Sequence, residues 1–293
     1  MTVNGNIPHT YTDAMNRPDS DLWLEACLEE LAALRETKTY IPVRINDVDP
    51  HNIVGCRWVF TLKRGPDGEV ERYKARIVAK GFNQVYSIDY DETFAPVVKW
   101  VSIRILLALA ARLDLEVHQM DVKTAFLNGE LEHEIFMSPP PGCPDYGSKD
   151  VVWKLEKSLY GLKQSSRAWY TKAKTELHKP QFERSDSDHA VFSFSTSTKF
   201  CIIALYVNNL MIISNSPSLL RRKKRQLMSA FMMKDLGNIH WFLGLEITHH
   251  QAKKLIFISQ SRYIADIVER FSFANSQLQC LQDRSFLSTT WTA

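Results

Sequence analysis

The sequence predicts an α+β fold built around an antiparallel sheet, and three observations lead to this prediction. An apolar run from Cys201 to Val207, the polar pair Asn208-Asn209 and a second apolar run ending at Ser214 form the pattern of a β-hairpin. Four other segments carry apolar residues at helical spacing. Predicted strands and helices alternate along the chain around the hairpin, as an antiparallel α+β sheet requires.

The N-terminal part of the chain is predicted to contain a tail, a helix and a hairpin. Residues 1–18 are polar and interrupted by Pro8 and Pro18, so we expect a tail. Asp19 or Ser20 is expected to cap a helix that continues to about Arg35, with apolar residues at helical spacing. Between residues 56 and 78, β-rich runs flank Gly65-Pro66-Asp67-Gly68, a strong turn signal.

The central and C-terminal parts are predicted to alternate helices with strands. A helix is expected to begin at Ser102, because its apolar residues recur at i, i+3, i+4 and i+7. It leads into a strand from Glu116 to Val122, which carries Asp121 near its end. Two further helices are expected over about 167–178 and 217–232. Residues 276–293 show no usable periodicity.

Bulk properties restrict the class of protein but do not identify it. A chain of 293 residues with 45% hydrophobic content can bury one large core or two modest ones. The net charge of +3 is compatible with nucleic-acid binding without indicating it. Five scattered cysteines argue for reduced intracellular thiols, and no apolar run approaches the ~20 residues of a membrane span. We therefore expect a soluble intracellular protein, cytoplasmic or nuclear, without a membrane segment.

The most specific information lies in a set of long segments that follow one another in a fixed order. They are Arg57-Trp58-Val59-Phe60, residues 74–84 (KARIVAKGFNQ), residues 89–99 (DYDETFAPVVK), residues 119–131 (QMDVKTAFLNGEL), residues 159–164 (LYGLKQ), residues 205–213 (LYVNNLMII), residues 233–237 (MKDLG) and residues 242–247 (FLGLEI).

Together these segments resemble the reverse transcriptase (RNA-directed DNA polymerase) domain of copia-type retrotransposon Pol polyproteins, over residues 21–271. The resemblance implies a right-hand polymerase with fingers and a ferredoxin-like palm, and with the thumb truncated or degenerate. It divides the chain into an N-terminal helix and fingers (19–100), a palm (101–271) with an interleaved fingers segment at about 135–175, and a degenerate tail (272–293). It implies an RNA template, a DNA primer and deoxyribonucleoside triphosphates as partners, and Mg²⁺ as cofactor.

Asp121 is the first candidate catalytic residue and metal ligand. Nucleotide addition uses two Mg²⁺ ions, which prefer anionic oxygen ligands. By resemblance these come from one Asp at a strand end and an Asp pair on a facing hairpin, where this chain has Asn208 and Asn209. Because Asn is neutral and carries an NH₂ donor, we expect weak metal binding and an inactive or strongly impaired enzyme. Taken alone, Asp121 also suits a helix N-cap and Asn-Asn suits a hairpin turn.

Four further residues are candidate nucleotide-binding residues by resemblance. Lys74 and Arg76 would contact the triphosphate, although a solvated strand face would also explain them. Phe126 would lie beneath the sugar and exclude a 2′-hydroxyl, or it is an ordinary core residue. Gln164 would touch the incoming nucleotide, but Ser165-Ser166 follow it where the family has Ala-Pro.

Two clusters of basic residues remain outside this set. The run Arg221–Arg225 could hold template backbone through counterion release, yet such runs on surface helices are usually only solvated. His240, His249 and His250 lack partners at metal-ligand spacing, so we expect surface residues.

Three functions compete. The leading hypothesis is a degenerate copia-type reverse transcriptase domain that folds but is catalytically impaired. The alternative is a domesticated, non-catalytic nucleic-acid-binding protein. The third is polymerisation through Asp121 alone, which the charge of two metal ions disfavours.

Overall fold

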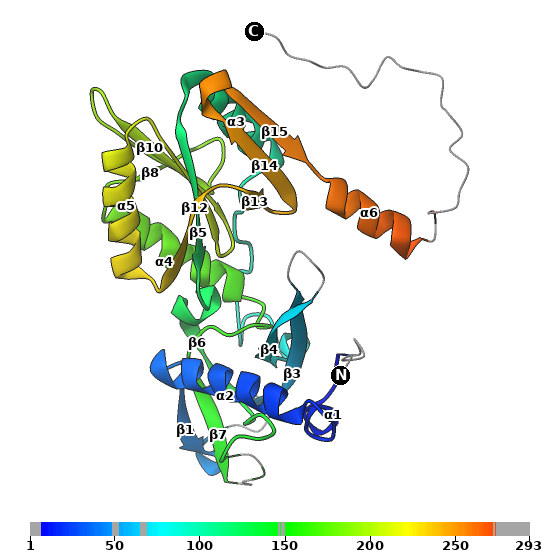
Figure 1. The fold of residues 1–293 in the computed structure, drawn as a ribbon. Helices are drawn as coiled ribbons and strands as arrows, with labels where there is room; N and C mark the ends of the chain where they lie inside the picture. The colour runs from blue at the N-terminus through cyan, green and yellow to red at the C-terminus, as the bar shows by residue number, and fades with distance from the viewer. Residues whose placement is uncertain are drawn as a thin grey trace.

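The computed structural model describes residues 7–48, 53–64, 69–145, 147, 150–271 and 273. The described chain forms two lobes, one built on a six-stranded sheet and one on a four-stranded sheet with a long β-ribbon (Figure 1). The mixture of helices and sheets confirms the predicted α+β class. The turn at 65–68 lies outside the described residues, and so does the predicted tail at 272–293 except Phe273.

The prediction of a polar tail over residues 1–18 is wrong for its second half. Helix α1 (Tyr11–Met15) forms because the Thr10 side chain accepts a hydrogen bond from the backbone N–H of Asp13. Ala14 within it is fully buried, and the Tyr11 ring stacks on Trp58 at 6.3 Å between centroids. The first helix of the described chain therefore packs on the rest of the lobe.

Helix α2 (Ser20–Glu36) confirms the predicted helix but not the predicted cap. Asp19 precedes it, yet its carboxylate accepts hydrogen bonds from Trp23 Nε1 at 3.2 Å and Arg17 Nε at 3.0 Å. Trp23 is fully buried against Phe60 and Tyr73 of the ribbon. Asp19 thus positions a core tryptophan instead of satisfying the first backbone amides of the helix.

Two β-structures complete this lobe. The sheet runs in the order β1 (Tyr40–Arg44), β7 (Val151–Lys157), β6 (Glu130–Met137) and β2 (Ile53–Val54), with only β2 and β6 parallel. Strands β3 (Cys56–Arg64) and β4 (Val70–Ala79) form an antiparallel ribbon, and α2 packs on β4. Short 3-10 helices follow at η1 (Ile45–Asp47) and η3 (Gly81–Asn83).

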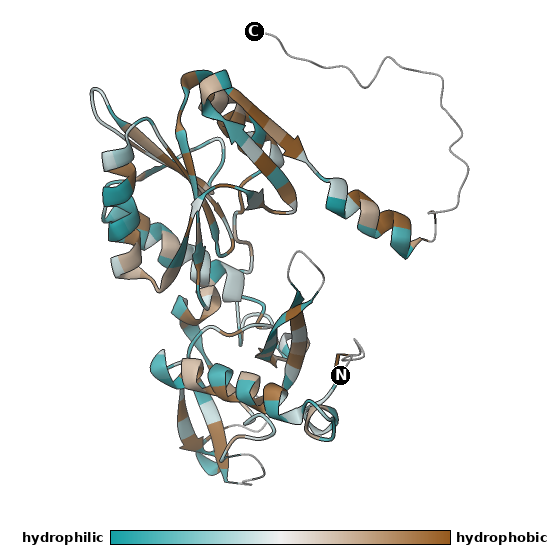
Figure 2. Cartoon of the chain, in the orientation of Figure 1, coloured by the Kyte–Doolittle hydropathy of each residue, from teal (hydrophilic) through white to brown (hydrophobic). Residues whose placement is uncertain are grey.

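The other lobe is a six-stranded antiparallel sheet covered by three helices. Its strands lie in the order β12 (Met233–Asn238), β5 (Glu116–Val122), β11 (Asn209–Ser214), β10 (Phe200–Tyr206), β9 (Val191–Ser195) and β8 (Glu183–Arg184). The helices are α3 (Trp100–Leu113), α4 (Ser165–His178) and α5 (Pro217–Ala230). Apolar residues concentrate on the central strands of this sheet (Figure 2).

Helix α3 shows how an apolar face sets the position of an element. Ile103, Leu107 and Ala110 are buried against the sheet, as the periodicity predicts. The helix begins at Trp100 instead of Ser102, because the Ser102 hydroxyl donates to Asp188 Oδ2 at 2.6 Å and does not cap the helix. The predicted strand Glu116–Val122 is confirmed as β5.

One continuous stretch of the chain contributes to the cores of both lobes. The stretch predicted to interleave, about 135–175, is divided between the two cores. Its strands β6 and β7 belong to the core of the four-stranded sheet, whereas α4 packs into the core of the six-stranded sheet through residues such as Trp169. The chain therefore crosses between the lobes just before α4.

The last described elements extend from the six-stranded lobe. Strands β13 (Trp241–Phe242), β14 (Leu245–His250) and β15 (Leu255–Ser259) form a small sheet, with η5 (Gln251–Lys253) between the last two. Helix α6 (Ser261–Arg270) follows and lies away from the core (Figure 1). Within the described residues, no helix is long and apolar enough to cross a membrane.

Candidate functional site

The candidate site lies at the end of the central strands of the six-stranded sheet. Strand β5 lies between β11 and β12, and Asp121 is paired in register with Asn209 on one side and with Lys234 on the other. Directly opposed residues of antiparallel strands bring their side chains close together. The hairpin and the strand of Asp121 are therefore adjacent, as the sequence predicted.

The hairpin turn differs by one residue from the prediction. Tyr206 pairs with Asn209, so the two turn residues are Val207 and Asn208, and Asn209 begins β11. Val207 has a φ of 52°, an uncommon conformation for a β-branched residue. The Asn-Asn pair suggested a turn because Asn tolerates positive φ. The strand pairing places the turn one residue earlier, and Asn209 instead pairs with Asp121 of β5.

A chain of amide hydrogen bonds joins Asp121 to the hairpin. Asn208 Nδ2 donates to Asp121 Oδ1, Asn209 Nδ2 donates to Asn208 Oδ1 at 3.3 Å, and Gln119 Nε2 donates to Asn209 Oδ1 at 3.4 Å. An ionised carboxylate only accepts hydrogen bonds, so the Asn208 NH₂ group is the one that faces it. Thr124, not Asp121, occupies the N-cap position of the following 3-10 helix η4 (Ala125–Asn128). The helix-cap explanation of Asp121 is thus excluded.

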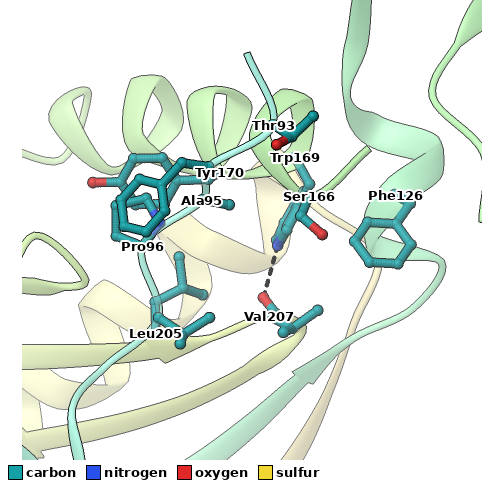
Figure 3. A pocket seen from close by; sticks show the side chains of 11 residues that line it. Thr93, Ala95, Pro96, Phe126, Ser166, Trp169, Tyr170, Leu205 and Val207 are labelled. Carbon is teal, nitrogen blue, oxygen red and sulfur yellow. Dashed lines mark hydrogen bonds between the residues drawn. The ribbon is translucent and has the colours of Figure 1, made fainter. Parts of the chain in front are cut away.

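An apolar cavity of about 290 Å³ lies behind the turn (Figure 3). Trp169 on α4 lines this cavity, and its indole N–H donates to the carbonyl oxygen of Val207 at 2.7 Å (Figure 3). Trp169 is almost completely buried and packs edge-on against Phe231 at 5.1 Å. This bond ties the strained turn residue to a helix in the core.

Asp121 opens into a second, polar cavity of about 320 Å³, bounded by α2, β4, the loop after β5 and the hairpin turn. Its charged lining consists of five cations and three carboxylates. These are Arg72, Lys74, Arg76, Lys123 and Lys234 on the one hand and Glu29, Glu30 and Asp121 on the other. The cations therefore exceed the carboxylates, and this favours an anionic ligand.

Lys74 and Arg76 line this cavity, so a solvated strand face does not describe them. The Arg76 guanidinium carbon lies 5.2 Å from the centroid of the Tyr160 ring. Arg76 Nε is buried, and no acceptor among the described residues pairs with it. Burial and the neighbouring Arg76 lower the pKa of Lys74. Two cations are thus held together without enough anions to satisfy them.

The carboxylates of the cavity are shaped by burial. Burial raises the pKa of Glu30, while the Ile77 N–H and the cations of β4 act in the opposite direction. Burial also raises the pKa of Asp121, against the Asn208 hydrogen bond and the charges of Lys74 and Lys234. Both carboxylates therefore lose part of their hydration in a partly enclosed site, and this loss disfavours their charged forms.

The residues present do not fit a pair of Mg²⁺ ions. Mg²⁺ requires several hard, preferably anionic, oxygen ligands in octahedral geometry. Asp121 is the carboxylate at the strand end, and the Asn208 amide already donates to it. In the described part of the chain, no group of three or more His, Cys, Asp and Glu side chains could hold a metal ion. The side chains around Asp121 therefore lack the anionic oxygens that a two-metal centre needs.

Of the other two predicted nucleotide-binding residues, Phe126 contacts a residue of the polar cavity and Gln164 does not. Phe126 is half-buried and packs edge-on against Tyr160 at 4.9 Å, so it contacts a residue of the polar cavity from the apolar side. Gln164 is buried away from the cavity. It accepts a hydrogen bond from Gln84 at 3.1 Å and donates to the Asp89 carbonyl at 2.8 Å. Its bonds are those of a structural residue.

Several residues of the cavity were not predicted from the sequence, and Tyr160 and Glu30 are two of them. Tyr160 lines it, although the motif at 159–164 had directed attention to Gln164, four residues on. Glu30 faces it from α2 and accepts a hydrogen bond from the Ile77 N–H at 3.3 Å. A signal for Glu30 was present, because it is an acidic residue within a helix whose neighbours predict burial. Its target could not be read from the sequence.

The basic run on α5 is divided between the core and the surface. Lys223 Nζ donates to the Pro180 carbonyl and lies 3.3 Å from the Phe194 ring centroid. Lys224 forms an ion pair with Asp235 at 2.5 Å and contacts His118 Nδ1 at 2.9 Å. The three arginines are exposed. Only these three are therefore available to nucleic acid.

Of the histidines expected at the surface, His240 and His250 are exposed. His249 is half-buried, which corrects the expectation for that residue. Its buried Nε2 atom has no hydrogen-bond partner among the described residues, and burial lowers its pKa. It lines a cavity of only about 70 Å³ beside Glu116, a volume suited to water.

Comparisons with known proteins agree with the resemblance noted from the motifs. A family model described as reverse transcriptase (RNA-dependent DNA polymerase) matches residues 38–281. The chain is 41% identical over 271 residues to the retrovirus-related Pol polyprotein from transposon TNT 1-94 of Nicotiana tabacum, covering 92% of this chain and 20% of that protein.

Two Arabidopsis thaliana proteins are also similar. The retrovirus-related Pol polyprotein from transposon RE1 is 43% identical over 221 residues, covering 74% of this chain and 15% of the relative. The corresponding protein from transposon RE2 is 39% identical over 268 residues, covering 90% of this chain and 18% of the relative. The chain thus spans a fifth or less of the length of these relatives.

Proposed function

The chain belongs to the family of copia-type retrotransposon reverse transcriptases, and from this premise we propose that it retains the nucleotide cavity but has lost most or all nucleotide-addition activity. In this proposal the six-stranded lobe is the palm, and the ribbon β3–β4 with the four-stranded sheet forms the fingers. The substrates implied by the family are deoxyribonucleoside triphosphates, an RNA template and a DNA primer. Mg²⁺ is the cofactor that the family implies.

One observation carries the proposal: the Asn208 amide donates to Asp121 at the position where a second carboxylate is expected. Replacing two carboxylates by amides removes two negative charges from a site that must balance two divalent ions and a triphosphate. Asp121 is left among Lys74 and Lys234, which further reduces its attraction for a cation. Metal affinity and rate should therefore fall by orders of magnitude.

Primer extension tests the proposal directly. The unmodified protein, given an RNA–DNA primer–template, deoxyribonucleoside triphosphates and Mg²⁺, should extend no more primer than the Asp121→Asn variant does. Extension by the unmodified protein well above that variant would overturn the proposal. The double change Asn208→Asp and Asn209→Asp restores the missing carboxylates, and we expect it to extend primer above the unmodified level.

The cations around the cavity also support the alternative of a non-catalytic nucleic-acid-binding protein. An RNA–DNA hybrid should then bind with an affinity that falls steeply as salt rises, because binding releases counterions. Neutralising the exposed Arg221, Arg222 and Arg225 should reduce that salt dependence if they contact the backbone. An unchanged salt slope would assign these arginines to solvation.

A further inference from the structure

We propose that the polar cavity beside Asp121 binds the terminal phosphates of a nucleoside triphosphate without a divalent metal ion. This inference rests on the proposed function, since the cavity is the one assigned there to the nucleotide. It goes further in stating that the two asparagines make binding independent of metal. The site would then sequester nucleotides and not react them.

The first support is the unsatisfied cationic charge of the cavity. Five cations face three carboxylates in about 320 Å³, and Glu29 is already paired with Arg72 at 2.6 Å. Arg76 presents a buried Nε that no acceptor among the described residues satisfies. A buried, unpaired guanidinium nitrogen is costly, so a phosphate oxygen placed there gains a charge-assisted hydrogen bond. The ligand indicated is a compact anion with several oxygens.

The second support is the state of Asp121. In a metal-dependent site the carboxylates and the triphosphate repel each other until cations join them. Here the Asn208 NH₂ group donates to the single carboxylate at the strand end. Lys74 and Lys234 add positive charge around it. The repulsion that a metal ion must overcome is therefore largely absent.

The lining of the cavity favours a small ligand over a nucleic-acid strand. Glu30 and Ala33 of α2 line it together with β4 and Asp121, so three separate elements bound about 320 Å³. A terminal phosphate offers three non-bridging oxygens and can enter end-on. A backbone phosphate offers two and carries a sugar on each side. The terminal phosphate suits the recessed Arg76 better.

Glu30 is a carboxylate that repels an incoming anion and competes with it for the cations of β4. It lies near Lys74 and Arg76 of β4, the residue is 8% exposed, and it accepts a hydrogen bond from the Ile77 N–H at 3.3 Å. Removing its charge while keeping its shape should raise anion affinity. The change Glu30→Gln does this and leaves one amide oxygen to accept the Ile77 hydrogen bond.

Equilibrium binding of deoxythymidine triphosphate to the whole chain, measured by calorimetry in EDTA and in Mg²⁺, tests the proposal. We expect affinities within about threefold of each other in the two buffers. Arg76→Gln should weaken binding about tenfold or more, because a charge-assisted phosphate contact is lost. Arg57→Gln is the matched control, since Arg57 lies exposed on the neighbouring strand β3 and outside the cavity. Glu30→Gln should tighten binding severalfold.

Three results would overturn the proposal: binding that requires Mg²⁺, equal losses in Arg76→Gln and Arg57→Gln, or Arg76-dependent binding of a DNA oligonucleotide lacking a triphosphate with none of the nucleotide. Inorganic triphosphate that binds as well as the nucleotide supports recognition of the phosphates themselves. Asn208→Asp should convert the site, so that binding weakens in EDTA and recovers in Mg²⁺. Primer extension by the unmodified protein would refute the proposed function, whereas Arg76-dependent nucleotide binding in EDTA would still support metal-independent binding.

Discussion

Returning a carboxylate to the hairpin turn should make the stability of the protein depend on Mg²⁺. In the unmodified chain the Asn208 amide donates to Asp121 Oδ1. Asn208→Asp removes that donor and places a second negative charge beside the first. Two costs follow: the lost hydrogen bond and the new repulsion.

The size of the effect follows from the site. A hydrogen bond to a charged group contributes about 1.5–3 kcal/mol. Two like charges about 4 Å apart repel by about 1 kcal/mol in water and by about 4 kcal/mol at an effective dielectric constant near 20. Asp121 is half-buried, and Lys74 and Lys234 offset part of the repulsion. We therefore expect the free energy of unfolding in EDTA near pH 8 to fall by about 3 kcal/mol.

Mg²⁺ and acid should each reverse part of this loss. A metal ion bound only by the folded variant at ten times its Kd adds about 1.4 kcal/mol by mass action. In the variant the carboxyl pair has a pKa raised by mutual repulsion in the folded state. A raised folded pKa means that stability is retained at low pH and lost as the pH rises through that value.

Urea unfolding followed by tryptophan fluorescence measures these effects in EDTA and in Mg²⁺. Asn208→Ala is the control, because it removes the hydrogen bond without adding charge and should not respond to Mg²⁺. The reasoning is refuted if Asn208→Asp is as stable as Asn208→Ala in EDTA, or if Mg²⁺ stabilises the unmodified protein equally.

Three further predictions concern the support of the site. Lys224→Met removes a buried ammonium that pairs with the exposed Asp235 carboxylate and contacts half-buried His118, and it should cost about 1–3 kcal/mol in urea unfolding, whereas exposed Arg225→Gln should stay within about 0.5 kcal/mol. Burial and Lys224 lower the pKa of His118, so the contribution of the neutral imidazole to stability is present above pH 6.5 and is lost as the pH falls through the lowered pKa. In His118→Gln, the unfolding free energy should therefore fall less between neutral and acidic pH, and an unchanged pH dependence would refute this. Trp169→Phe deprives the Val207 carbonyl of its donor and should lower the unfolding free energy by about 1–3 kcal/mol, a loss that unchanged urea midpoints would contradict.

The sequence by itself determined the family, the α+β class and the starts of the four long helices to within two residues. The strand Glu116–Val122 was placed without error, and the helices α2, α3, α4 and α5 began within two residues of their predicted starts, because apolar periodicity is a local property that the sequence displays. Asp121 and the hairpin were also predicted to meet, and they do. The replacement of a carboxylate by a neutral amide at Asn208 is likewise visible in the sequence.

The tertiary structure alone decided how those elements form a site. The turn lies at Val207 and Asn208 because β10 and β11 pair in the register that joins Tyr206 to Asn209, and β5 then pairs with β11 so that Asp121 meets Asn209. Glu30 lines the cavity because α2 packs on β4. Gln164 lies outside it, where its amide is hydrogen-bonded to Gln84 and to the Asp89 carbonyl. A side chain's residue type is written in the sequence, but the partner it meets is fixed only when distant segments pack.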